Sequence, residues 1–363
     1  MNWSWTLNAY LARHFFVSVM IVFGTLMLMT FCIDVVDIFN RTPSKEVPLG
    51  IVIGMSLLQL GDLGQKMLPF AMLFGSILAF SRLSRSHELV ATRAAGFSAW
   101  EFLAPPILVA VIMGVVTVTA INPIAASLLG QYERLEAKYI RGQASQLAVF
   151  KTGLWLRQGD ADHQSVIHAL RVSDQGVNLE DVIIFLYDGK DNFSGRIDAT
   201  GATLKQHRWY LQNAKVSGPE GAPKTYATYQ VPTDLTASQI QESFGSPDTI
   251  SFWDLPRFIA NAEAAGFSTL RHQLYWFSLL TMPVMFCAMV FMAASFSMRL
   301  ARLGGLVQLV LAAALCGFAV YFLGSFTQAL GEGGVLPVPV AALAPAIGAI
   351  LLGMTLVFHQ EDG

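Results

Sequence analysis

The chain has 363 residues, of which 54% are hydrophobic and 13% are charged, and its mean hydropathy is +0.51. A soluble protein of this length has too small an interior for so much apolar sequence, so the composition predicts a polytopic α-helical membrane protein. The formal net charge of −2 argues against a nucleic-acid-binding protein, which needs a basic surface. The 3 cysteines fall within apolar stretches at no metal-ligand spacing, so neither a disulfide framework nor a metal site is expected.

Six apolar stretches are predicted to cross the membrane. The stretch 1–14 carries aromatic residues typical of a membrane interface and no signal-peptide cleavage pattern, so the first span is expected to be retained. The apolar stretch 49–60 is followed by Gly61, Asp62 and Lys66, and we interpret it as a separate interfacial helix. The expected spans are residues 15–33, 63–83, 102–121, 274–298, 303–326 and 335–358.

The basic segment Ser81–Ser98, SRLSRSHELVATRAAGFS, separates the second and third spans. Read as a helix, it has an apolar face that includes Leu89 and a charged face that includes Glu88 and Arg93, and Gly96 is a suitable C-terminal stop. Such a helix would lie along the membrane surface and present its polar face to a partner. The same charges also fit a solvated loop that only sets the orientation of the chain.

The basic residues predict which side of the membrane each loop occupies. The short loops on one side carry only Arg41 and Lys45. The N-terminal stretch and the two loops on the other side carry Arg13, Arg82, Arg85, Arg93, Arg299 and Arg302. Because basic short loops stay in the cytoplasm, both termini are predicted to be cytoplasmic and the polar insert to lie on the far side.

The polar region between the third and fourth spans is predicted to be a separate domain. Its core, about 143–245, holds about seven short strand-like runs separated by turns that contain Gly, Asp or Pro. Strands at this spacing favour an antiparallel sandwich or roll, flanked by helices at 125–141 and 253–265. The predicted organisation is three spans in 1–122, the insert in 123–272 and three spans in 273–363.

We find no sequence motif for catalysis or ion coupling. The chain has no G-x-x-x-x-G-K-[ST] loop and no G-x-S-x-G, and His87-Glu88 lacks the second histidine of a zinc helix because Ala91 stands there. The last four expected spans hold no ionisable residue near their middles, so a proton- or sodium-driven pump lacks its parts. A transporter of this kind would need energy from another protein. The alternatives are a membrane enzyme acting on envelope lipid or peptide, and a non-transporting scaffold whose β domain recruits partners.

Residues 86–96, SHELVATRAAG, resemble the S-x-E-L-x-x-x-[RQ]-A-x-G coupling helix of the YjgP/YjgQ permease family. Its members LptF and LptG are the membrane subunits of the ABC transporter that extracts lipopolysaccharide from the bacterial inner membrane. Leu68-Pro-Phe, Gly153-Leu-Trp and Gly266 also match, so the resemblance covers nearly the whole chain. The proline-containing last span and the Glu361-Asp-Gly end look more like LptG than LptF.

The resemblance implies a non-catalytic permease subunit without a cofactor, in the inner membrane of a Gram-negative bacterium and with a periplasmic jelly-roll-like β insert. The implied partners are a cytoplasmic ABC ATPase dimer, a second six-span permease of the LptF type and periplasmic β-jelly-roll bridge proteins. Glu88 would sit in a groove of the ATPase, Arg93 and Gly96 would shape the coupling helix and its end, and Leu89 belongs to the same set. An open β edge would accept a bridge domain by strand addition.

The resemblance also implies that lipopolysaccharide passes between span 1 of one permease and span 5 of the other. The candidate lipid contacts in the outer halves of these spans are Met27, Phe31, Asp34, Arg41, Phe318, Tyr321 and Phe322. Aromatic residues at helical spacing also serve ordinary packing. Family members often carry basic residues near the outer end of span 1, whereas this chain has Asp34 there, and Arg41 is either a phosphate ligand or an ordinary interfacial arginine. A distinct lipid A, or phosphate contacts made by the other subunit, would explain the departure.

Overall fold

The computed structural model describes residues 5–41, 48–86, 88, 98–136, 139–140, 146–150, 153–159, 163–173, 178–188, 192–205, 207–218, 222–233, 246–264, 268–300 and 306–361. The chain divides into two compact units, which are described separately. The helical unit comprises Met1–Ile140, Ser251–Trp253 and Gln273–Gly363, and the β unit comprises Arg141–Ile250 and Asp254–His272.

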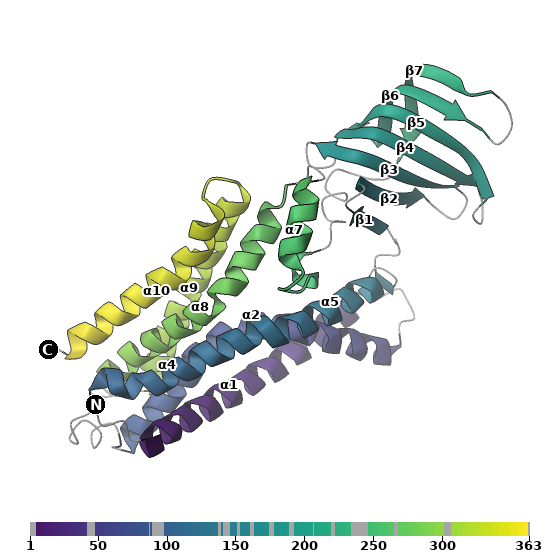
Figure 1. The fold of residues 1–363 in the computed structure, drawn as a ribbon. Coiled ribbons are helices and arrows are strands. Elements are labelled where there is room, and N and C mark those ends of the chain that lie inside the picture. Colours follow the sequence, from purple (N-terminus) through teal and green to yellow (C-terminus); the bar gives the residue numbers. More distant parts are fainter. Residues whose placement is uncertain are drawn as a thin grey trace. The chain divides into compact units, whose positions relative to one another are not determined.

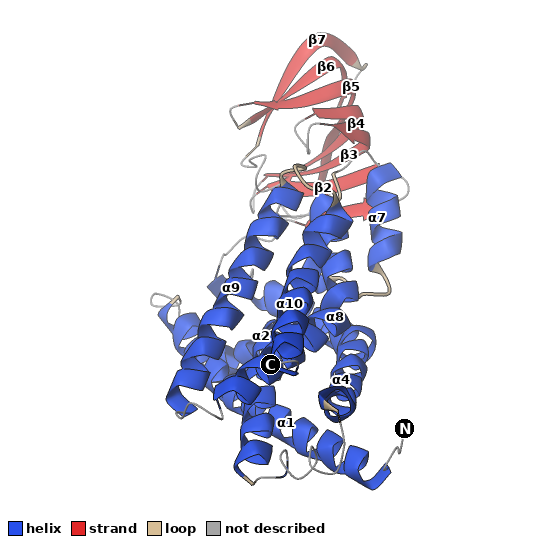
Figure 2. Ribbon diagram, turned by 90° about the vertical axis from the view of Figure 1, so that its left-hand side faces the viewer, coloured by secondary structure: helices blue, strands red, loops and turns tan. Residues whose placement is uncertain are grey.

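Long apolar helices make up most of the helical unit (Figure 1, Figure 2). In chain order they are α1 (Trp5–Asn40), α2 (Leu49–Arg85), α4 (Ala99–Val116), the π-helix η1 (Thr117–Ile121), α5 (Asn122–Glu136), α8 (Leu270–Leu300), α9 (Leu306–Glu332) and α10 (Val338–Glu361). The elements α4, η1 and α5 follow one another without a break and together form one span. The described residues therefore contain 6 helices that are long and apolar enough to cross a membrane. This confirms the prediction of six spans.

The second span differs from the prediction, because α2 is one continuous helix and residues 49–60 are its first part. A Cβ atom at Gly61 would lie 3.0 Å from both Cα and Cβ of Ala125, so the missing side chain lets α2 approach α5. The ammonium of Lys66 lies 2.8 Å from the carboxylate of Asp62, one turn away on the same helix. The residues that interrupt the apolar sequence therefore form a helix contact and an ion pair, and they do not end the helix.

Glycines also allow the closest helix contacts elsewhere in the helical unit. A Cβ atom at Gly75 of α2 would lie 2.5 Å from the Cα atom of Val19 in α1. A Cβ atom at Gly114 of α4 would lie 2.5 Å from the Cα atom of Pro283 in α8. Small residues serve this purpose in membranes, where van der Waals packing and not the hydrophobic effect drives helix association.

An aromatic cluster joins α1 to the ends of α2 and α4. The ring of Phe80 lies 6.4 Å from that of Phe15 and 5.8 Å from that of Phe102, measured between centroids. Leu83, in the last turn of α2, is buried in the same cluster. Phe80, near the end of α2, thus packs against both α1 and the start of α4.

The β unit is built on one antiparallel sheet whose strands follow one another in the order β1 to β7 (Figure 1). This confirms the antiparallel β insert between the third and fourth spans, and the sequential strand order is that of a meander. The strands are β1 (Gln146–Phe150), β2 (Gly153–Gly159), β3 (His163–Ser173), β4 (Asn178–Asp188), β5 (Asn192–Lys205), β6 (Arg208–Ser217) and β7 (Lys224–Pro232).

Burial alternates along the strands with the period of two that a sheet requires. In β5, Ile197 and Ala199 are buried, whereas the residues beside them are more accessible. Trp209 of β6 is fully buried in the same core. The short helix α7 (Leu255–Ala264) packs Phe258 and Ala262 against this core, so α7 belongs to the β unit.

Candidate functional site

The basic segment Ser81–Ser98 begins within the end of α2 and reaches to the N-cap of α4. α2 ends with Arg82 and Arg85 in its last turn, where positive charge is favoured by the helix dipole. α4 begins with a capping box, in which Glu101 N donates to the Ser98 hydroxyl at 3.2 Å and Ser98 N donates to the Glu101 carboxylate at 3.1 Å. Both ends of the segment are therefore held at defined points.

The structure describes one of the residues predicted to contact an ATPase. Glu88 is helical and half-buried. Leu89, Arg93 and Gly96 lie outside the described residues, and their roles stay predictions.

The predicted lipid contacts on α9 form an accessible aromatic surface. Phe318, Tyr321 and Phe322 are 65%, 61% and 62% exposed. The rings of Phe318 and Phe322 stack with centroids 6.5 Å apart, and Tyr321 contacts Phe70 of α2 at 5.9 Å. Within a spanning helix such a surface faces acyl chains or another membrane protein, because these are the apolar surroundings that a bilayer offers.

The apolar candidates on α1 lie closer to the protein interior. Met27 and Phe31 are half-buried. A Cβ atom at Gly64 of α2 would lie 3.4 Å from the sulfur of Met27, so this methionine packs on α2. Because α2 contacts both α1 and α9, it links the two groups of predicted lipid contacts.

The two charged candidates on α1 differ in their surroundings. A guanidinium nitrogen of Arg41 lies 2.6 Å from the carboxylate of Asp37, and the two side chains are 55% and 48% exposed. Arg41 keeps donors that this pair does not use, since a guanidinium has five. Asp34 is half-buried, and its Oδ2 atom has no hydrogen-bond partner among the described residues. In the part of the chain that the structure describes, no three His, Cys, Asp or Glu side chains lie close enough together to hold a metal ion.

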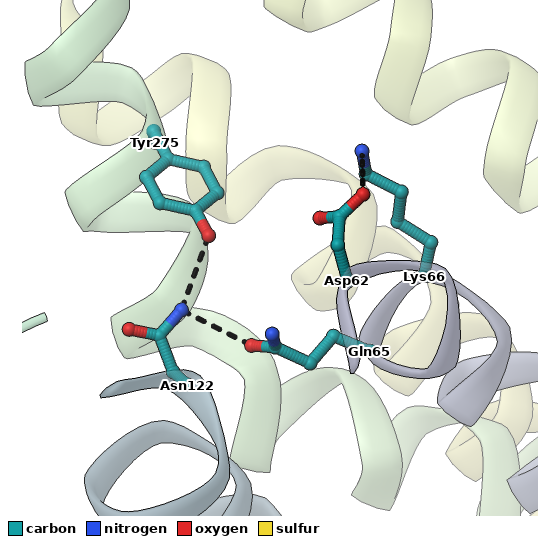
Figure 3. A network of polar contacts seen from close by, with 5 residues as sticks. All are labelled: Asp62, Gln65, Lys66, Asn122 and Tyr275. Carbon is teal, nitrogen blue, oxygen red and sulfur yellow. Dashed lines mark hydrogen bonds and ion pairs between the residues drawn. The ribbon is translucent and has the colours of Figure 1, made fainter. Parts of the chain in front are cut away.

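The structure adds one basic residue to the site that the sequence analysis did not include. Lys66 is paired with Asp62, yet its side chain is 54% exposed whereas that of Asp62 is 8% exposed (Figure 3). Lys66 precedes Phe70 by one helical turn, and Phe70 contacts Tyr321. An accessible ammonium and an aromatic surface thus lie next to each other, which suits an anionic lipid. The signal in the sequence was a lysine inside an otherwise apolar stretch, an arrangement that marks functional positions in membranes.

A polar network that includes Gln65, which directly precedes Lys66, lies beside this pair (Figure 3). The side-chain amide of Asn122 donates to the Gln65 carbonyl and to the Tyr275 hydroxyl, both at 3.1 Å, and its oxygen accepts from Phe252 N at 2.8 Å. The network joins α2, α5, α8 and the segment Ser251–Trp253. Since Asn122 uses both donors and its acceptor within the protein, its role is to hold these elements together.

A proline explains the neighbouring contact of Trp253. Pro123 has no N–H, so the carbonyl of Thr119, four residues earlier, lacks its usual helical donor. The indole N–H of Trp253 donates to this carbonyl at 3.2 Å. The Ser251–Trp253 segment is therefore fastened to the helix at its π-helical turn by two hydrogen bonds, one to Asn122 and one to Thr119.

Comparison with protein families identifies the chain. The family described as "Lipopolysaccharide export system permease LptF/LptG" matches residues 9–358. The chain belongs to this family. It is thus a multi-pass inner-membrane permease, a component of a transporter. The match covers both types of subunit together, so the closer likeness to LptG stays a prediction. No curated protein matches the chain.

Proposed function

We propose that this permease is a non-catalytic subunit of an ABC transporter that extracts lipopolysaccharide from the inner membrane and passes it to a periplasmic bridge. The observation that carries the proposal is the accessible aromatic surface of α9 next to Lys66 of α2. Acyl chains would lie on the aromatic side chains, and the ammonium would attract phosphate groups of the lipid. Family membership supplies the class of substrate.

The energy would come from a cytoplasmic ABC ATPase dimer that docks on the segment Ser81–Ser98, with Glu88 as its main contact. The proposed orientation follows the basic residues, with both termini in the cytoplasm and the β unit in the periplasm. A second permease of the LptF type would be required, because lipopolysaccharide would pass between span 1 of one subunit and span 5 of the other. In this chain α1 and α9 would each form one half of such a passage.

The β unit would receive the lipid and hand it on. In the described sheet β1 and β7 are the two end strands, each paired with one neighbour. End strands present main-chain donors and acceptors, so either one offers a place for a bridge domain of β structure to add by strand pairing.

The test is co-purification from native membranes, followed by reconstitution in vesicles. We expect the parent chain to bring down an ATPase, a second permease and bound lipopolysaccharide, and to release the lipid when ATP is added. Glu88→Ala should retain the second permease but lose ATP-driven release. A parent chain that purifies without an ATPase and without lipid would refute the transporter and favour the scaffold.

A further inference from the structure

Contacts with α5 fix the orientation of α2 near its middle. A Cβ atom at Gly61 would lie 3.0 Å from Ala125, and the side-chain carbonyl of Gln65 accepts a hydrogen bond from Asn122 at 3.1 Å. Asp62 lies between these two contacts along the helix and is 5% exposed. Because α2 cannot turn about its axis without breaking both contacts, the carboxylate of Asp62 is held inside the helical unit.

Lys66 is the accessible partner of this carboxylate. Its ammonium lies 2.8 Å from a carboxylate oxygen of Asp62, yet its side chain is 54% exposed (Figure 3). Phe70 follows one turn later and contacts Tyr321 of α9, and a Cβ atom at Gly317 would lie 3.6 Å from the same phenylalanine ring. α9 therefore passes close to α2 here. An anionic lipid on the aromatic surface of α9 would meet an ammonium that already has a carboxylate beside it.

We infer that Asp62 limits how tightly this site holds the phosphate groups of the lipid, and so allows the lipid to leave. The ammonium of Lys66 has three donors, so it can bind the carboxylate and a phosphate at the same time. It cannot leave Asp62 for the phosphate without stranding a buried charge, which is costly. The phosphate therefore shares the ammonium and is repelled by the carboxylate behind it. This inference rests on the proposed function, since it assumes that lipopolysaccharide contacts Lys66.

The carboxylate of Asp62 has two opposite effects on lipid binding. It orders the lysine side chain, and loss of that order would lower the affinity by at most about thirtyfold. It also repels the phosphate. With the ammonium between them at hydrogen-bond distances, the two anions lie about 5 Å apart, and their repulsion at an effective dielectric constant of about 20 lowers the affinity by about two hundredfold to three hundredfold. Repulsion is the larger effect, and the net result is about tenfold weaker binding.

The first test measures lipid binding without ATP, by the full-length chain with the subunits that co-purify with it, in phosphatidylcholine nanodiscs. The probe is fluorescent lipid A that carries both phosphates. Asp62→Asn keeps the shape of the side chain and removes its charge, so we expect the Kd to fall about tenfold. Lipid A without phosphates is the control, and its Kd should not change. In a Lys66→Met background, Asp62→Asn should tighten binding less than about twofold, because no ammonium then draws the phosphate to this place.

The second test measures release after ATP is added. Asp62→Asn should release the phosphorylated lipid A about tenfold more slowly than the parent complex, and the phosphate-free lipid at the parent rate. Unchanged or weaker binding by Asp62→Asn, or equal tightening for the phosphate-free lipid, would overturn the inference. Equal tightening for phosphatidylglycerol would assign the site to ordinary phospholipid and overturn it as well.

The parent complex separates this inference from the proposed function. If the parent binds and releases lipid A and Asp62→Asn behaves in the same way, only the role of Asp62 is refuted. If the parent binds no lipid A, the proposed function is refuted and the role of Asp62 with it.

Discussion

Substitution of Gly75 by alanine tests whether close helix approach stabilises the helical unit. The added Cβ atom would lie 2.5 Å from Val19 Cα and 3.1 Å from Val19 N, both backbone atoms that cannot rotate away. Carbon atoms in contact are normally about 3.5–4.0 Å apart, so α1 and α2 must separate locally by about 1 Å. Overpacking of this kind costs about 1–3 kcal/mol, and contact with backbone places Gly75→Ala in the upper half of that range.

A control on α1 removes the effect of helix propensity. Alanine favours a helix over glycine by about 1 kcal/mol, which partly hides the steric cost in Gly75→Ala. Gly24 has no atom within 4 Å of its Cβ position, so Gly24→Ala should show only the gain. The difference between the two variants therefore isolates the steric term, about 2–3 kcal/mol.

The assay is reversible unfolding in mixed detergent micelles, followed by circular dichroism as the denaturing detergent is increased. We expect Gly75→Ala to unfold at a lower detergent fraction than the parent chain and Gly24→Ala at an equal or higher one. If Gly75→Ala is as stable as Gly24→Ala, α1 and α2 do not approach as closely as the structure shows, and the reasoning fails.

Three further substitutions test the polar and β regions. Asn122→Leu should lower the free energy of unfolding in the same assay by about 3 kcal/mol, at about 1 kcal/mol for each of three lost hydrogen bonds; a loss below about 1 kcal/mol would show that the network is not formed. Lys66→Met should cost about 1–2 kcal/mol because it removes the ammonium from the buried Asp62 carboxylate, and Lys66→Met with Asp62→Asn should recover most of the loss. No recovery would mean that Lys66 acts independently of Asp62. Phe258→Ala should increase amide exchange in α7, because this ring packs the helix on the sheet; equal exchange in the variant and the parent would refute that contact.

Secondary structure could be predicted wherever its signal is local. The predicted core of the β insert, about 143–245, contains all the described strands, from β1 (Gln146–Phe150) to β7 (Lys224–Pro232). Alternation with a period of two is visible in a few consecutive residues, and so is an apolar run long enough to cross a bilayer. The six spans and the β insert follow from these patterns.

The site could be predicted only in part. The aromatic residues of α9 were found because they recur at helical spacing, and their exposure is consistent with the predicted role without testing it. Lys66 was set aside because the sequence suggested a break between residue 60 and residue 63.

The sequence by itself determined which segments are helices or strands, the family, and the type of residue at each site, because hydropathy and side-chain period are properties of short stretches. Only the tertiary structure decided what the exceptional residues do. Gly61 does not end a helix but lets α2 pack closely against Ala125. Asn122 hydrogen-bonds to groups that are 130 and 153 residues away along the chain. Contacts of this kind depend on which surfaces meet when the helices pack, and that is set by all the helices together and not by any one stretch.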